Sequence, residues 1–167
     1  MKKLQIVVKY QDDYIRKYLI NEIGQIMNDH QELSWVLMVA GVELLGRCVS
    51  LDLGSAADKN SHSSKPYFRA GLKLLGNKYE KLDDTAHDLY KFRNGLCHLT
   101  FSVEGFAISE RVNKSEHLSV DNGKLILVAE DFYEDFKVAC EKVIEMRRAG
   151  QIGDKFHIEG IKSINII

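Results

Sequence analysis

The sequence predicts a mainly α-helical fold: an antiparallel bundle of four to five helices with a small β-hairpin appendage between the last two helices. Two observations favour this class. Apolar residues recur at helical spacing in several segments of the chain, as in helices that bury one side. Over about residues 103–128 the pattern instead becomes β-branched and partly alternating, and it contains Asn122 and Gly123, the strongest short-range signal for a hairpin.

The composition is that of one soluble globular domain over residues 1–167. Hydrophobic residues make up 45% and charged residues 28% of the chain, which excludes global disorder. The formal net charge of −1 excludes the broad electrostatic coat of a general DNA-coating protein, so any contact with nucleic acid must be local. The three cysteines are widely spaced in apolar runs, which indicates small buried residues in a reducing, cytoplasmic environment rather than a disulfide or zinc framework.

The first elements follow from apolar periodicity. Residues 2–10 are β-rich and form either a short strand or the lead-in to a helix. Asp12 or Asp13 suits the N-cap of a first amphipathic helix. Its apolar residues recur at helical spacing: Ile15, Tyr18, Leu19, Ile23 and Ile26. A second, largely buried helix is expected over about residues 31–53.

The apolar run of this second helix is long enough to raise the question of a membrane span. Glu43 and Arg47 lie near its middle, where charged side chains would be costly in lipid, and no signal-peptide pattern precedes it. We therefore expect a buried helix of the bundle and no membrane partner.

A basic helix is expected in the middle of the chain. It follows residues 54–65, which are small, polar and aperiodic and are expected to form a flexible surface loop. Pro66 suits the first turn of a helix that the pattern extends over about residues 66–79. Three basic residues recur on it at steps of four: Lys65, Arg69 and Lys73. They form a solvated helix face or, less commonly, a set of phosphate contacts.

The last two helices flank the hairpin region. Three residues suit the start of the first of them, because negative charge is favourable at a helix N-terminus: Asp83, Asp84 and Thr85. This helix is expected to end near His98. The final helix covers about residues 129–149, with Gly150 as its stop. The tail over residues 155–167 is suited to pairing with another strand, in the chain or in a partner.

The helix that ends near His98 has two faces. At about 100° per residue, four apolar residues fall on the side that a bundle would bury: Leu89, Phe92, Leu96 and Leu99. Four polar residues fall on the opposite side, within about 60° of one another: His87, Lys91, Asn94 and His98. Arg93 lies about 140° from His98 on an ideal helix. The two side chains meet only if Arg93 reaches round, if the helix ends near His98, or if a second chain supplies the partner.

The segment "RNGLCH" at residues 93–98, preceded by "LYKF", resembles the motif of the HEPN superfamily, in which an arginine and a polar residue are followed by variable residues and a histidine. The resemblance implies a helical bundle that cleaves single-stranded RNA without a metal or other cofactor. It also implies a homodimer that brings two such motifs together through this helix. A role as a toxin or in defence against foreign nucleic acid, with an antitoxin or another protein as partner, is a further implication of the resemblance.

The chemistry of RNA cleavage assigns roles to these residues. Attack by the 2′-hydroxyl needs an acid or base that titrates near neutral pH and a fixed positive charge on the phosphate. Histidine and arginine suit these tasks, which makes His98 the acid or base and Arg93 the phosphate clamp. Asn94 would orient the reacting groups by hydrogen bonding. Three further residues are candidates for orienting or supporting this set: Glu43, Lys91 and His87.

Each main candidate also has a purely structural interpretation. Arg93 suits a boundary position at which the stem lies along the core and the head pairs with an acid. His98 suits a helix C-terminus, where the dipole favours positive charge. Glu43 would orient Arg93 or His98 across the bundle in the catalytic interpretation. Because Arg47 follows it by four residues, it equally suits a salt bridge within its own helix.

Two alternatives to a nuclease stay open. One is a non-catalytic domain of the same fold that binds a nucleotide, nucleic acid or protein partner, and the other is a plain helical interaction module. No metal site is predicted, because His87 with Asp83 or Asp84 has no third ligand at a recognisable spacing. The sequence also lacks a glycine-rich phosphate loop, a nucleophile elbow and a Cys-x-x-Cys pair, which excludes the commonest nucleotide-binding, hydrolase and redox motifs.

Overall fold

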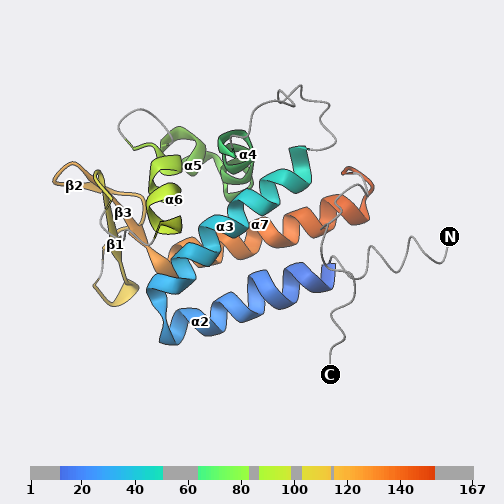
Figure 1. Cartoon of the computed structure of the whole chain (residues 1–167), viewed down its shortest axis with the longest axis horizontal. Helices are drawn as coiled ribbons and strands as arrows, with labels where there is room; N and C mark the ends of the chain where they lie inside the picture. The colour runs from blue at the N-terminus through green and yellow to red at the C-terminus, as the bar shows by residue number, and fades with distance from the viewer. Residues whose placement is uncertain (1–11, 51–63, 83–86, 99–102, 114, 153–167) are drawn as a thin grey trace.

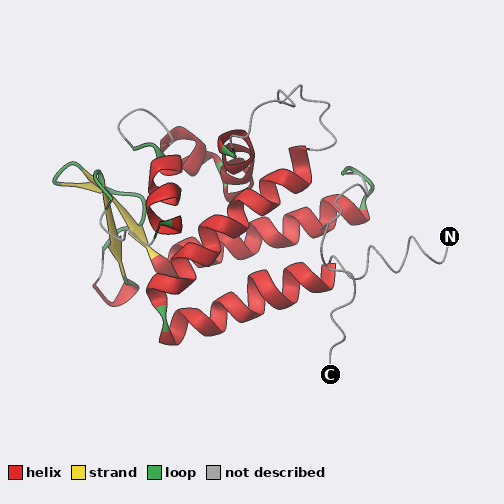
Figure 2. Cartoon of the chain, in the orientation of Figure 1, coloured by secondary structure: helices red, strands yellow, loops and turns green. Residues whose placement is uncertain are grey.

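The computed structural model describes residues 12–50, 64–82, 87–98, 103–113 and 115–152. Its helical segments are η1 (Ile15–Glu22), α2 (Ile23–Asp29), α3 (Gln31–Ser50), α4 (Lys65–Leu75), α5 (Asn77–Leu82), α6 (Leu89–Cys97), η2 (Arg111–Asn113) and α7 (Ala129–Arg148). Its strands are β1 (Phe106–Ser109), β2 (Val120–Asp121) and β3 (Lys124–Val128). The fold is therefore mainly helical, with a small sheet at one end of the bundle, as the sequence predicts (Figure 2).

The long helices form the centre of the molecule. The helix formed by η1 and α2 lies beside α3 and α7, and α4 and α6 pack against another side of α3 (Figure 1). Trp35 of α3 is fully buried at this junction, with its ring 5.7 Å from that of Phe92 in α6 and 4.9 Å from that of Phe132 in α7. The short helix that carries the RNGLCH segment (residues 93–98) is thus anchored in the core.

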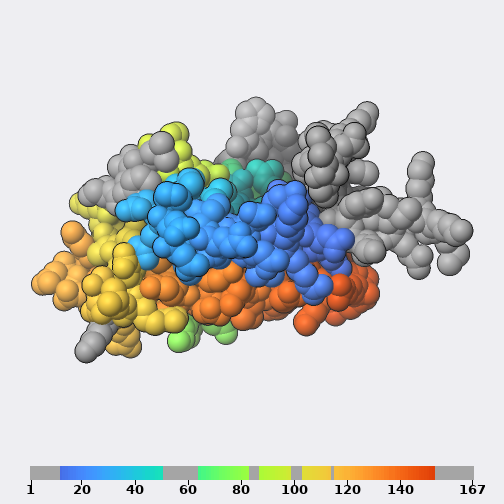
Figure 3. Space-filling model, turned by 90° about the horizontal axis from the view of Figure 1, so that it is seen from below, coloured from blue at the N-terminus to red at the C-terminus, as the bar shows by residue number. Residues whose placement is uncertain are grey.

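The first amphipathic helix is confirmed. Residues 12–29 are helical throughout, with π-type hydrogen bonding in η1. Its buried apolar residues recur every four positions: Ile15, Leu19 and Ile23. Asp12 and Asp13 already lie inside the helical turn that leads into η1, so neither is the predicted N-cap. The buried Asp12 carboxylate instead accepts a hydrogen bond from Nε of Arg148 at 2.9 Å, which ties this helix to the end of α7. The two helices, blue and orange to red, lie against each other on the surface that Figure 3 shows.

α3 is the buried helix that the sequence predicts, although residues 51–53 lie outside the described part. It is long and apolar enough to cross a membrane by length and composition, and among the described residues it is the one helix of that kind. Most of it is nevertheless buried inside the bundle, and Trp35, Met38 and Val42 have no exposed surface. Packing within the protein therefore accounts for its apolar character.

The helix predicted over residues 66–79 is in fact two helices. α4 ends at Leu75, and Gly76 has a φ of 129°, a conformation that favours glycine. α5 then begins at Asn77. Leu75 and Tyr79 are both buried, so the apolar periodicity continues across the break and conceals it in the sequence. Pro66 lies in the first turn of α4, as predicted.

The predicted start of the next helix is also wrong. α6 begins at Leu89, and its N-cap is Asp88, whose carboxylate accepts a hydrogen bond from the backbone N–H of Tyr90 at 3.0 Å. His87 precedes the helix and so does not belong to its polar face. Residues 83–86 and Leu99 lie outside the described residues.

The sheet has the strand order β1-β3-β2. β2 and β3 form the predicted hairpin, and Asn122 and Gly123 at its turn have φ values of 48° and 76°, the left-handed conformation that a two-residue turn requires. β1 pairs with β3 in parallel, with Phe106 opposite Leu125, which a simple hairpin does not predict. Leu125 is fully buried, so the sheet contributes to the core.

α7 has the predicted bounds, and Gly150 follows it with a φ of 68°. The predicted strand or lead-in over residues 2–10, most of the loop predicted over residues 54–65, and the tail over residues 155–167 lie outside the described residues.

Candidate functional site

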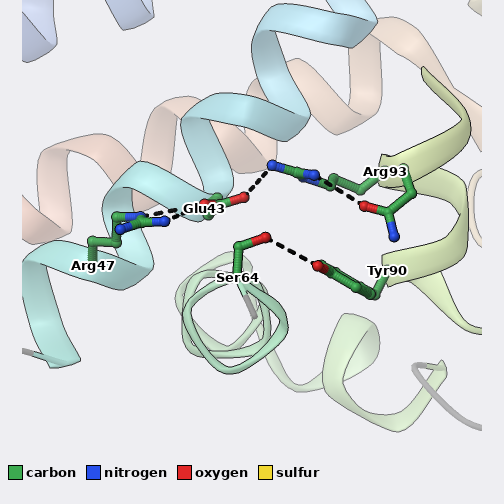
Figure 4. A network of polar contacts seen from close by, with 6 residues as sticks. Glu43, Arg47, Ser64, Tyr90 and Arg93 are labelled. Carbon is green, nitrogen blue, oxygen red and sulfur yellow. Dashed lines mark hydrogen bonds and ion pairs between the residues drawn. The ribbon is translucent and has the colours of Figure 1, made fainter. Parts of the chain in front are cut away.

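Arg93 lies on the side of α6 that faces α3. Its Nη2 atom donates to Oε2 of Glu43 in an ion pair, and its Nη1 atom donates to Oδ1 of Asn94 at 2.9 Å (Figure 4). The Nε atom is buried and has no hydrogen-bond partner among the described residues. The side chain is 20% exposed, so the guanidinium occupies a fixed position at the boundary of the core.

Glu43 bridges two arginines. Its Oε1 atom accepts from Nη2 of Arg47 at 2.8 Å and from Nε at 3.2 Å, while Oε2 pairs with Arg93 (Figure 4). Glu43 therefore makes both the salt bridge within its own helix and the contact with Arg93. Within the described residues, no contact joins Glu43 to His98. The Glu43 side chain is 10% exposed and that of Arg47 is 45% exposed. The buried acid thus holds two cations, and the trio carries a formal charge of +1.

A second set of contacts fixes α6 against the start of α4. The hydroxyls of Ser64 and Tyr90 are 3.0 Å apart, and Nζ of Lys65 is 2.9 Å from Oδ2 of Asp88 (Figure 4 shows the first pair). Burial by itself raises the pKa of the Asp88 carboxyl, but hydrogen bonds from Lys65 and from the backbone N–H groups of Tyr90 and Lys91 outweigh it and lower that pKa. Asp88 is consequently a charged and paired residue at neutral pH.

His98 is the C-cap of α6, where its backbone N–H bonds to the carbonyl of Asn94 at 3.1 Å. The helix therefore ends at His98, one of the conditions under which Arg93 and His98 can meet. Its side chain is exposed and has no hydrogen-bond or ion-pair partner within the described part of the chain. Because Glu43 draws Arg93 towards α3, the described residues show no contact between Arg93 and His98. Within a single protomer, Arg93, Asn94 and Glu43 therefore lie together, and His98 lies apart from them on the surface.

The two supporting candidates near the motif are in different places. Lys91 is exposed on α6, about two turns before His98 and on the same face. His87 lies before the helix, and its ring is nearly perpendicular to that of Phe106 of β1, with the ring centres 6.3 Å apart. Lys91 therefore stays with the polar face of α6, and His87 lies beside the sheet.

The basic residues of α4 take part in ion pairs. Lys65 pairs with Asp88, and Nζ of Lys73 lies 2.9 Å from Oε1 of Glu80 in α5. Arg69 is exposed on the same helix. The ion pairs of Lys65 and Lys73 with neighbouring acids favour a solvated helix face. Phosphate contacts at these residues stay a prediction.

Two of the three predicted buried cysteines are buried, whereas Cys97 is half-buried. No group of three His, Cys, Asp or Glu side chains among them is placed to hold a metal ion, and the candidate partners Asp83 and Asp84 of His87 lie outside them. Cys48 and Cys140 are buried and unpaired. Burial raises the pKa of Cys48 to about 12 and also raises the pKa of Cys140, so both thiols are unreactive at neutral pH.

A partly buried polar cluster joins α5 to α7 and to the loop before β2. The Tyr79 hydroxyl donates to Oδ2 of Asp135 at 2.7 Å and lies 2.8 Å from Nε2 of His117. The backbone N–H of Val128 donates to Nδ1 of His117 at 2.9 Å, so the ring proton of neutral His117 belongs on Nε2, where it can donate to Tyr79. The partners of Tyr79 are 38 and 56 residues away in sequence, and no local pattern predicts them.

This cluster predicts a pH-dependent stability. Burial lowers the pKa of His117 despite the attraction of Asp131 and Asp135, and nearby Lys78 lowers it further. Unfolded histidine titrates near pH 6.5, so below that value the unfolded chain binds a proton that folded His117 resists. We expect the free energy of unfolding to fall as pH decreases through about 6.5 towards 5, as measured by urea denaturation at a series of pH values.

The control for this prediction is His117→Asn, which keeps an acceptor for the Val128 N–H but does not titrate. The variant should be less stable at pH 7.5 and should show a shallower loss of stability between pH 6.5 and 5. Parallel curves for the two proteins would mean that other groups cause the pH dependence.

The candidate site thus consists of a positioned arginine, its acid and amide partners, and an exposed histidine at the end of the same short helix. No protein-family model, no curated protein and no solved structure matches the chain.

Proposed function

We propose that the chain is a HEPN-like, metal-independent endoribonuclease that cleaves single-stranded RNA as a homodimer. The observation that carries the proposal is the arrangement on α6: a guanidinium held by Glu43 and Asn94, and an exposed imidazole five residues later. A positioned cation is suited to stabilise the charge that develops on a phosphate, because it needs no rearrangement as the reaction proceeds. An imidazole open to solvent is accessible to a substrate.

The chemistry requires no group beyond these side chains. The 2′-oxygen attacks the phosphorus while its proton leaves, and the bond to the 5′-oxygen breaks, which gives a 2′,3′-cyclic phosphate and a 5′-hydroxyl. His98 takes the first proton or supplies the one that the leaving 5′-oxygen needs. Arg93 uses one hydrogen of Nη2 for Glu43 and one of Nη1 for Asn94, so the second hydrogen of each atom is left for a phosphate oxygen.

The homodimer is part of the proposal because the described residues of one chain do not join the two groups. Arg93 is held on the α3 side of α6, and His98 is exposed at the helix end. Pairing of two α6 helices would place His98 of one protomer near Arg93 of its partner. The resemblance extends this proposal to a cytoplasmic toxin or defence nuclease, with an antitoxin or another protein as partner.

The test is cleavage of labelled single-stranded RNA in excess EDTA. His98→Ala should lower the cleavage rate by about 10²–10⁴-fold, the usual contribution of a general acid or base. Arg93→Ala should lower it by about 10²–10³-fold, as loss of one charge-stabilising group does. An RNA with a single 2′-deoxy nucleotide at the cleaved position should resist the wild-type protein. Cleavage of that RNA, or equal rates for all three proteins, would contradict the proposal.

Mixing the two inactive variants tests the shared site. In a symmetric dimer, a heterodimer of Arg93→Ala and His98→Ala has one complete site and one site without either group. If half of the dimers are mixed, the mixture should recover about a quarter of the wild-type rate. A mixture as inactive as its components would show that each site belongs to one chain.

One observation favours a second candidate, a non-catalytic domain of the same fold that binds a nucleotide, nucleic acid or protein. Glu43 and Asn94 already engage Arg93, and a purely structural arginine at a core boundary would need the same partners. In this case the wild-type protein leaves RNA intact, and Arg93→Ala lowers stability only.

A further inference from the structure

A solvent-open groove lies between the start of α6 and the sheet. It encloses about 590 Å³, and its wall comes from α6, from the segment that leads into β1, and from the turn between β2 and β3. The residues that matter most for its chemistry are Asp88, Lys91, Glu104, Phe106 and Lys124. Three separate segments therefore converge on one concave surface beside the helix of the HEPN-like motif.

The groove has two available cations. Lys91 and Lys124 are both exposed, and within the described residues neither ammonium group has an ion-pair or hydrogen-bond partner. Asp88 is neutralised by its ion pair with Lys65, which leaves Glu104 as the one acid in the lining without a described partner. This differs from α4, where Lys65 and Lys73 are paired with acids. The groove is thus a better place for phosphate than the basic strip of α4.

The groove is also placed in line with His98. Lys91 and His98 are seven residues apart on one face of α6, which corresponds to about 10 Å along the helix axis. A strand that lies along this face would pass from the lysines to the imidazole. Flexible ammonium groups contact phosphates as point charges, without reading bases, so such a groove would follow the backbone of a single strand independently of its sequence.

We propose that the groove between α6 and the sheet binds the phosphodiester backbone of the single-stranded RNA next to the cleaved bond, with Lys91 and Lys124 as its phosphate contacts. This inference rests on the proposed nuclease function, whose substrate it places on the protein surface. The small net charge of the whole chain makes such a local contact the main source of attraction for RNA.

The experiment measures binding without cleavage. A fluorescent 2′-O-methyl oligonucleotide cannot use its 2′-oxygens as nucleophiles, so fluorescence anisotropy at several salt concentrations reports binding alone. For a single strand, log affinity falls with log salt, and each lost phosphate contact makes this slope less steep by about 0.7. Lys91→Ala and Lys124→Ala should each lower the slope by that amount, and the double variant by about 1.4.

The control is Lys142→Ala, which removes an exposed lysine about 20 Å along α7 from the sheet and should leave the slope unchanged. If the wild type and the double variant have equal slopes, or if Lys142→Ala reduces the slope as much as either groove variant, RNA binding does not take place in this groove and the proposal is refuted. A nucleoside monophosphate that binds as tightly as the oligonucleotide would overturn the strand-binding assignment, because one phosphate would then suffice.

The two proposals fail in different ways. If unmodified RNA stays intact but binding depends on Lys91 and Lys124, the groove is supported and the nuclease is refuted. If RNA is cleaved and the double variant has the wild-type KM and salt slope, the nuclease is supported and the groove is refuted. A double variant with a raised KM, an unchanged kcat and a reduced slope supports both.

Discussion

Gly46→Ala is expected to lower the free energy of unfolding by about 3 kcal/mol or more, or to prevent folding. A Cβ atom at this position would lie 1.8 Å from the carbonyl oxygen of Tyr67 and 2.6 Å from the backbone nitrogen of Gly71. Those atoms belong to the backbone of α4, so the clash is relieved only if α3 and α4 move apart. Gly71 has the reciprocal constraint, with its Cβ 2.0 Å from the carbonyl oxygen of Val42.

Urea denaturation of the variant measures this effect, and Gly24→Ala is a graded control. The nearest atom to a Cβ on Gly24 is Oη of Tyr133 at 2.3 Å, the far end of a side chain that can turn away. That movement would break the hydrogen bond from Tyr133 to the carbonyl of Ile20, so a loss of about 1 kcal/mol is expected. Equal losses in Gly24→Ala and Gly46→Ala would show that α3 and α4 adjust easily at their crossing.

Glu43→Ala is expected to cost about 3 kcal/mol of stability, because it leaves Arg93 at the core boundary without its acid. Arg47→Ala removes the other partner of Glu43, but that side chain is 45% exposed, so a loss below about 1 kcal/mol is expected. Thermal and urea denaturation of both variants compares the contributions of the Glu43–Arg93 and Glu43–Arg47 ion pairs to stability. The same Glu43→Ala variant should also lose RNA cleavage, since the guanidinium would no longer be held in place.

A double-mutant cycle separates the ion pair from other effects of truncation. If Glu43 and Arg93 stabilise the fold through their contact, the Glu43→Ala and Arg93→Ala double variant loses less stability than the sum of the single variants. Strictly additive losses would show that the pair contributes no coupling energy, and the positioning of Arg93 would then need another explanation.

The sequence predicts those parts of the fold that depend on local pattern. α3 and α7 are long helices with broad apolar faces, and Phe132 and Phe136 are buried as their spacing indicates. The turn at Asn122 and Gly123 follows from the need for two consecutive positive φ values, which few residue pairs adopt readily. The helix at Leu89–Cys97 is predicted from its apolar periodicity, because Leu89, Phe92 and Leu96 fall on one face, and all three are buried.

Features decided by tertiary contacts are not visible in the sequence. The break at Gly76 is not visible in the sequence, because the buried residues of α4 and α5 continue the same helical spacing across it. The sequence offers Glu43 a partner in Arg47, whereas the contact with Arg93 depends on how α6 approaches α3. The cluster around His117 likewise follows from the packing of separate segments.

The direct passage of β3 into α7 has a consequence for protein engineering. Val128 ends the strand and Ala129 begins the helix, so no linker separates the sheet from the bundle. The sheet cannot be excised or transplanted as a module without cutting into the scaffold that supports it. The exposed turn of Asn122 and Gly123 lies at the far end of the hairpin from that junction, so an insertion there would spare the junction, but it would obstruct the groove that this turn lines.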